Sequence, residues 1–127
     1  MDTPLWVPPA DRIEQAGMNR FAHGAERRWH RDFGDYETLH RWSCERPSEF
    51  WTSLWEFAGI VGDPGDTVLV DGDRMPGAKF FPSGRLNFAE NLLRRRDDGD
   101  AIVFRGEDRI RRRLSYRQLY QAVSRFA

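Results

Sequence analysis

The sequence is short of cysteine and lysine: Cys44 and Lys79 are the single residues of each kind among 127. One cysteine cannot build an intrachain disulfide framework, so we expect a reducing compartment. No apolar run approaches the ~20 residues of a membrane-spanning helix. Residues 1–5 also lack the basic and apolar regions of a signal peptide. The sequence therefore predicts a soluble, cytoplasmic protein.

Net charge is absent as well, because 20 Lys and Arg residues balance 20 Asp and Glu residues. Without an overall field, nothing draws the chain towards nucleic acid or an anionic membrane. We therefore predict neither partner.

Metal-binding and nucleophilic patterns are also missing. The histidines are His23, His30 and His40, and we find no second cysteine, H-x-x-x-H pair or neighbouring carboxylate to complete a metal set. We expect structural histidines. Cys44 has no base or oxyanion hole in its sequence neighbourhood, so we expect a small, buried hydrophobic side chain.

Two loops need weighing against ligand binding. Asp71 and Asp73 form a D-x-D pair, for which an Asx turn is a better expectation than a cation site. The glycine-rich segment 59–65 lacks the Lys and Ser or Thr of a phosphate loop, and Asp63 would repel phosphate. The sequence thus predicts no catalytic, cofactor-binding or metal-binding residue in this chain.

Arginines gather in two clusters, residues 94–96 and Arg109 with 111–113. Acidic residues border both clusters, and on a strand Arg111 and Arg113 would face one side and Arg112 the other. We expect a solvated, partly salt-bridged surface. The alternative is a stand-alone interaction module that binds an anionic partner through these arginines.

Aromatic residues are plentiful, with five Trp and nine Phe, which argues against disorder. Apolar residues recur at helical spacing in residues 11–31 with a break near Gly17, in 35–46 and in 47–58. Asp11 and Asp35 occupy N-cap positions, and Pro47 separates the last two helices. Pro4, Pro8 and Pro9 keep the start extended, with residues 5–7 as a docking strip.

The second half mixes strands and helices. We predict a strand at 67–70, a turn at 71–73 and an ordered loop pinned by aromatic rings at 80–84. Asn87 should cap a helix running to about Arg94, with Leu92 and Leu93 facing inward and the arginines of 94–96 in its last turn. Phe81, Leu86 and Phe88 should be buried beneath it.

The last segment predicts a β-hairpin of strands 101–105 and 110–114, followed by a helix. Ser115 and Gln118 have capping-box spacing, and we expect this helix to be still running at Ala127. Because an isolated hairpin is only marginally stable, we expect this segment to begin a larger domain and to leave an apolar face exposed.

Three stretches carry a resemblance to a known family. The first stretch comprises Pro4-Leu5-Trp6, Asp35-Tyr36, Arg41-Trp42-Ser43, Pro47, Glu49, Phe50 and Trp51. The second runs from Val70-Asp71-Gly72-Asp73 through Met75-Pro76-Gly77-Ala78 and Phe81-Pro82 to Arg85-Leu86-Asn87-Phe88-Ala89-Glu90-Asn91-Leu92-Leu93. The third is Leu114-Ser115-Tyr116-Arg117-Gln118-Leu119-Tyr120. These stretches resemble the N-terminal region of acetoacetyl-CoA synthetases, in the adenylate-forming acyl-CoA synthetase superfamily. Residues 80–84 depart slightly, since Trp-Phe-Pro followed by one residue and Ala is more usual.

The resemblance implies an α+β fragment of a longer ligase. Residues 1–98 would form an N-terminal helical cap with a clamp loop, and 99–127 would begin the large α/β AMP-binding domain. The family joins acetoacetate to coenzyme A with ATP and Mg²⁺, in lipid and ketone body metabolism. Its catalytic motifs lie beyond the matched region, so no catalytic or cofactor-binding residue transfers to this chain. The implied partner is the remainder of the synthetase.

Overall fold

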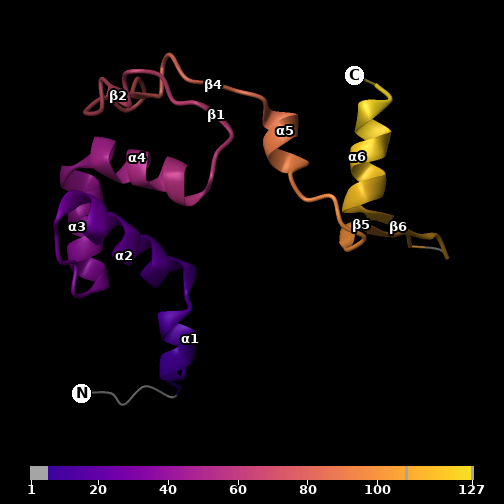
Figure 1. The fold of residues 1–127 in the computed structure, drawn as a ribbon, viewed down its shortest axis with the longest axis horizontal. Helices are drawn as coiled ribbons and strands as arrows, with labels where there is room; N and C mark the ends of the chain where they lie inside the picture. Colours follow the sequence, from indigo (N-terminus) through magenta and orange to yellow (C-terminus); the bar gives the residue numbers. More distant parts are fainter. Residues whose placement is uncertain (1–5, 108, 127) are drawn as a thin grey trace. The chain divides into compact units, whose positions relative to one another are not determined.

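The chain folds into two compact units, Met1–Arg85 and Leu86–Ala127 (Figure 1). The computed structural model describes residues 6–107 and 109–126. The described residues leave out Leu5 of the predicted docking strip, Asp108 of the predicted hairpin turn and Ala127. The domain boundary predicted between residues 98 and 99 concerns the family's domains and stays a prediction.

The first unit begins with helices α1 (Ala10–Glu14), α2 (Gly17–Trp29), α3 (Tyr36–Glu45) and α4 (Pro47–Phe57). The predicted break near Gly17 is confirmed. Asp35 caps α3, because its side chain accepts a hydrogen bond from the Thr38 N–H at 2.8 Å.

The predicted N-cap at Asp11 is wrong. Helix α1 starts at Ala10 with Pro9 as its N-cap, so Asp11 lies inside the first turn and makes no cap hydrogen bond. A carboxylate in the first turn still complements the helix dipole, which explains why the residue suits this place.

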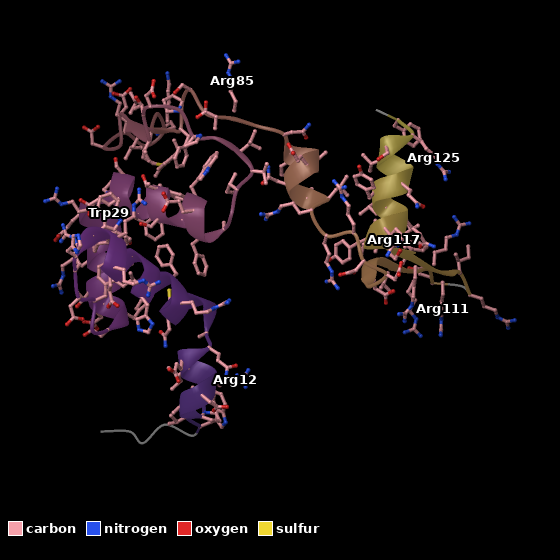
Figure 2. All side chains as sticks on the ribbon, viewed as in Figure 1. Arg12, Trp29, Arg85, Arg111, Arg117 and Arg125 are labelled. Atoms are coloured by element: carbon pink, nitrogen blue, oxygen red, sulfur yellow. The ribbon has the colours of Figure 1, made fainter. Side chains whose placement is uncertain are left out.

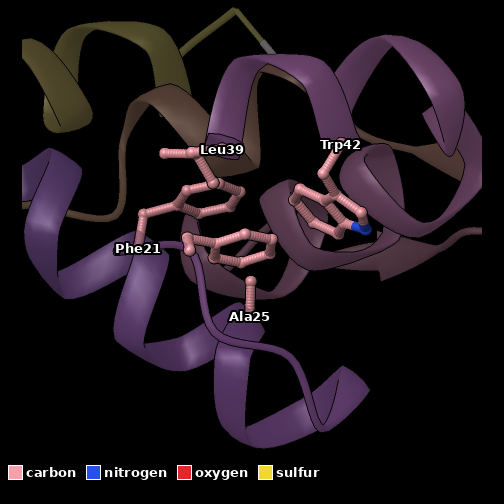
Figure 3. Packing of buried hydrophobic residues seen from close by; sticks show 5 residues of the cluster. Phe21, Ala25, Leu39 and Trp42 are labelled. Atoms are coloured by element: carbon pink, nitrogen blue, oxygen red, sulfur yellow. The ribbon is translucent and has the colours of Figure 1, made fainter. Parts of the chain in front are cut away.

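The core of this unit is a cluster of buried residues from α2, α3 and the segment between them: Phe21, Ala25, Phe33, Leu39 and Trp42 (Figure 3). The rings of Phe33 and Trp42 lie 4.8 Å apart, and Phe50 of α4 approaches Phe21 edge-on at 5.6 Å. The indole N–H of Trp42 donates to Glu49 Oε2 at 2.8 Å, so the buried ring leaves no polar atom unsatisfied.

Four two-residue strands follow in the segment after α4: β1 (Gly62–Asp63), β2 (Leu69–Val70), β3 (Lys79–Phe80) and β4 (Arg85–Leu86). β1 is hydrogen-bonded to β4, and β2 pairs antiparallel with β3. The predicted turn after Val70 is confirmed, since the Arg74 N–H donates to the Asp71 carbonyl at 3.0 Å.

Aromatic rings attach this loop to helix α4. Trp51 lies 5.0 Å from Phe80, and Trp55 lies 4.8 Å from Phe81, measured between ring centroids. Each such pair adds about 0.5–1.5 kcal/mol beyond the area that it buries. The prediction of a loop pinned by aromatic rings is therefore confirmed.

The second unit comprises α5 (Phe88–Leu92), β5 (Asp100–Arg105), β6 (Arg111–Ser115) and α6 (Tyr116–Ser124). The predicted hairpin is confirmed, with Val103 opposite Arg113 and Phe104 opposite Arg112. The predicted capping box is confirmed too, because Ser115 and Gln118 exchange both hydrogen bonds at the start of α6.

Three expectations about this unit are wrong. Asn87 does cap α5, but the helix ends at Leu92, so the arginines of 94–96 follow it and do not lie in its last turn. Leu93 is buried, whereas Leu92, Leu86 and Phe88 are exposed, because a five-residue helix buries little of its surface. Helix α6 ends at Ser124 and does not run on to Ala127. Phe81, in the first unit, is partly buried against Trp55.

The described residues thus mix helices with small antiparallel sheets, which is compatible with the predicted α+β class. No helix among them is long and apolar enough to cross a membrane.

Candidate functional site

The arginines after α5 pack on the aromatic side chains of α6. The guanidinium carbon of Arg95 lies 4.5 Å from the ring centroid of Tyr116, and that of Arg96 lies 4.0 Å from the ring centroid of Tyr120. Arg95 also donates to Asp97 Oδ2 at 2.6 Å. Two of the three arginines of this cluster are therefore used in holding α6 to the segment before β5.

Three aspartates pair with arginines around the same segment. Arg117, labelled in Figure 2, donates to Asp98 Oδ1 at 2.8 Å. Arg113 forms an ion pair with Asp100. The hydrogen bond from Arg95 holds the pKa of Asp97 below its ordinary value, and the bond from Arg117 does the same for the pKa of Asp98. The prediction of a partly salt-bridged surface is confirmed.

Arginines on the hairpin are less engaged. The register places Arg111 and Arg113 on one face of the hairpin and Arg112 on the other, as the sequence predicted. Arg111 and Arg112 make no ion pair within residues 6–107 and 109–126. The hairpin arginines are therefore separate cations and do not form one flat basic patch. This arrangement does not favour the alternative of a module that binds an anionic partner.

The carboxyl groups of Asp97 and Asp98 are expected to titrate below the ordinary aspartate pKa of 3.8. Because both folded-state pKa values are lowered, the ionised groups contribute stability that is present above the unfolded-state pKa. This stability is lost as the pH falls through the lowered values. Side-chain carboxyl NMR measures both midpoints.

Two variants test the ion pair between Asp98 and Arg117. Arg117→Gln should raise the midpoint of Asp98 towards 3.8, because the side-chain hydrogen bond from Arg117 is the largest cause of its lowered pKa. Arg112→Gln, on the hairpin, should leave it unchanged. An unchanged Asp98 midpoint in Arg117→Gln would contradict the pair.

The first unit contains a hollow of about 400 Å³ bordered by α2 and α3, and its carboxylates are already occupied. Glu26 accepts from the Phe33 N–H at 3.0 Å, Asp32 from the Gly34 N–H at 3.0 Å, and Asp35 from the Thr38 N–H. These carboxylates shape the turn between α2 and α3. Their role is structural.

The other residues weighed in the sequence do not assemble into a site. Within the described part of the chain, no group of three or more His, Cys, Asp or Glu residues could hold a metal ion. His23 and His30 are exposed. In the glycine-rich segment, Asp63 accepts from the Gly65 N–H at 2.8 Å, so its carboxylate closes the loop.

The prediction that Cys44 is buried is wrong, because this thiol is exposed. Leu39 and Trp42 turn the other side of α3 to the core, which leaves Cys44 facing outward. Its sulfur lies 3.8 Å from Nε2 of His40, one turn earlier on the same helix. The four-residue spacing of His40 and Cys44 places both side chains on one face of the helix.

Comparison with known proteins identifies the region. Residues 36–92 match the family model described as "Acetyl-coenzyme A synthetase N-terminus". The chain is 47% identical over 124 residues to "Acetoacetyl-coenzyme A synthetase" of Rhizobium meliloti, covering 98% of this chain and 19% of that protein. It is 31% identical over 130 residues to the acetoacetyl-CoA synthetase of Macaca fascicularis, covering 97% of this chain and 19% of that protein.

A further relative carries a different name. The malonamoyl-CoA synthetase vrtB of Penicillium aethiopicum is 32% identical over 91 residues, which is 70% of this chain and 12% of that protein. No solved structure matches the chain.

These matches define a class first: the N-terminal region of acyl-CoA synthetases, whose named members here are CoA ligases. The more particular resemblance is also confirmed, and the chain is recognised as the N-terminal region of the acetoacetyl-CoA synthetase family. The chain spans about a fifth (19%) of the length of these two acetoacetyl-CoA synthetases.

Proposed function

We propose that this chain is the N-terminal region of a cytoplasmic, ATP-dependent acetoacetate–CoA ligase. The reaction is acetoacetate + ATP + CoA to acetoacetyl-CoA + AMP + diphosphate. The observation that carries the proposal is the 47% identity over 98% of the chain to a protein named for this product. ATP, Mg²⁺, coenzyme A and acetoacetate would be bound by the remainder of the ligase, which is also the partner of this region.

The part played by this region is structural. Its best-defined features are a buried aromatic cluster, capped helices and a loop held by two ring pairs. Features of this kind hold a backbone in one conformation. In the ligase they would support the nucleotide and acyl pockets from outside.

The proposal is tested with the product of the whole reading frame that contains this sequence. Acetoacetate-dependent exchange of diphosphate into ATP, followed by formation of acetoacetyl-CoA, is the expected result. Acetate and malonamate serve as competing acids, because they represent the other names among the matches. Exchange with none of these acids would overturn the ligase assignment, and a clear preference for another acid would overturn the substrate.

The 127-residue chain alone is expected to show only background diphosphate exchange with ATP and acetoacetate. The reason is that the family's phosphate loop and catalytic lysine have no counterpart in its sequence. The control is the whole gene product, assayed at the same molar concentration. Exchange by the short chain that persists through successive purification steps at constant specific activity would contradict this expectation.

A further inference from the structure

An open apolar groove of about 360 Å³ lies between helices α2, α3 and α4. The buried side chains of Phe21 and Leu39 line it from within, and the exposed side chains of Met18 and Phe57 line it nearer to solvent. Apolar sites that bind a partner group commonly have this size and this kind of lining. The groove can therefore accept an apolar side chain from outside.

The same unit exposes an apolar strip, Trp6 and Val7. These side chains are 65% and 62% exposed, and neither lines the groove. Pro8 and Pro9 follow the strip, and Pro9 is extended, with φ −59° and ψ 149°. The guanidinium carbon of Arg12 lies 5.7 Å from the ring centroid of Trp6. Because the prolines and this contact restrain the strip, it loses little entropy on binding.

We propose that the Trp6–Val7 strip of one copy of the chain docks in the apolar groove of a second copy. When two copies exchange their strips reciprocally, the result is a dimer with two-fold symmetry, the commonest form of homo-oligomer. The inference stands apart from the ligase reaction, since it depends only on two surfaces of the first unit.

The groove also suits the polar end of an indole ring. Tyr36, His40 and Ser43 are the polar residues among its lining. The Ser43 hydroxyl donates to the His40 carbonyl at 2.7 Å, so the Ser43 oxygen keeps its lone pairs for another donor. A buried Trp N–H normally requires such an acceptor. The apolar lining and this hydroxyl together match the two ends of the Trp6 side chain.

The strip of the same copy is separated from this groove by α1. It precedes that helix, whereas Gly17, the first residue that lines the groove, follows it. The side chain of Asn19 donates to the Ile13 carbonyl at 2.7 Å, which fixes the end of α1 to α2. The extended Pro9 keeps the strip from turning back along α1. We therefore assign the docked strip to another copy.

The buried area indicates a weak dimer. A Trp side chain buries about 150–250 Å². Two exchanged strips and the two grooves that receive them would thus bury about 1,000 Å² in total, near the lower limit for a specific interface. We expect separate chains in the dilute samples used for circular dichroism and dimers at about 0.1 mM or above.

Sedimentation velocity of the 127-residue chain at increasing concentration tests the proposal. The unaltered chain should pass from monomer to dimer. Trp6→Ala should weaken the dimer at least about tenfold, because a central Trp often dominates an interface. The hairpin variant Ile102→Thr/Phe104→Thr is the control and should leave the dimer unchanged. A monomer at every concentration overturns the proposal and leaves the groove to the remainder of the ligase. A dimer that Trp6→Ala does not weaken overturns it as well.

Disulfide trapping then identifies the contact. In a Cys44→Ser background, which removes the exposed thiol, Val7→Cys and Met18→Cys are placed on separate chains. Mixing the two chains under oxidation should give the linked heterodimer in preference to either linked homodimer. Val103→Cys, on the hairpin, replaces Met18→Cys as the control and should not show this preference. A chain that carries both Val7→Cys and Met18→Cys should form linked dimers. A linked monomer instead would show that the strip docks in its own groove, which contradicts the proposal.

Discussion

Replacing Trp42 by alanine is expected to destabilise the first unit by about 3–5 kcal/mol, the usual range for removing a buried Trp or Phe. The side chain is only 4% exposed and packs against the rings of Phe33 at 4.8 Å and Phe50 at 6.0 Å. Small domains have a total stability of about 5–15 kcal/mol. The loss would thus remove a large share of the stability of the unit.

Urea unfolding followed by circular dichroism measures this loss. Trp6→Ala is the matched control, because Trp6 is 65% exposed and should cost little. Trp42→Phe should fall between the two. It keeps an aromatic ring in the core but removes the N–H that donates to Glu49. Equal urea midpoints for Trp42→Ala and Trp6→Ala would show that the described core does not stabilise the unit.

Local signals in the sequence predicted most helix starts. Asp35, Asn87 and Ser115 each accept a hydrogen bond from a backbone N–H three residues later, so the information lies within one turn of the chain. Pro47 acts equally locally, since its fixed φ suits the first position of α4. Asp11 failed because a carboxylate fits both the cap and the first turn.

Burial could not be predicted in the same way, because it depends on what covers a residue. Phe88 and Leu92 lie in α5 and Leu86 lies just before its predicted N-cap, yet the structure leaves these three apolar residues exposed. For Cys44 the necessary information was present. Leu39 and Trp42 define the buried side of α3, and Cys44 lies well away from it around the helix axis.

In the candidate site, too, the sequence predicted some contacts and could not predict others. The acidic residues that border the arginine clusters predicted a partly salt-bridged surface, and Asp97, Asp98 and Asp100 do form ion pairs with arginines. The stacking of Arg95 and Arg96 on Tyr116 and Tyr120 joins residues about twenty positions apart, so it depends on the fold of the unit and has no local signal. The ligase assignment came from motif resemblance, since no constellation of reactive residues points to it.

The second unit is expected to bind a hydrophobic dye through one face of its hairpin. Ile102 pairs with Leu114, and Phe104 lies on the same face two residues along β5. These three side chains are 44%, 38% and 54% exposed, respectively. Full burial of each would contribute about 1.5–3 kcal/mol, part of which this unit does not gain. Such a patch attracts an apolar probe, because binding removes the patch from water.

A strong rise in the fluorescence of an environment-sensitive dye is the expected result for the native chain without denaturant. The double variant Ile102→Thr/Phe104→Thr should remove most of the rise, while the β-branched threonines keep the strand propensity of β5. Met75→Thr is the control, because Met75 is 96% exposed but belongs to the first unit and is no part of the hairpin. If the double variant and Met75→Thr give equal fluorescence, the hairpin face is not the dye site. Sedimentation of the unaltered protein would then show whether contacts between copies of the chain cover these side chains.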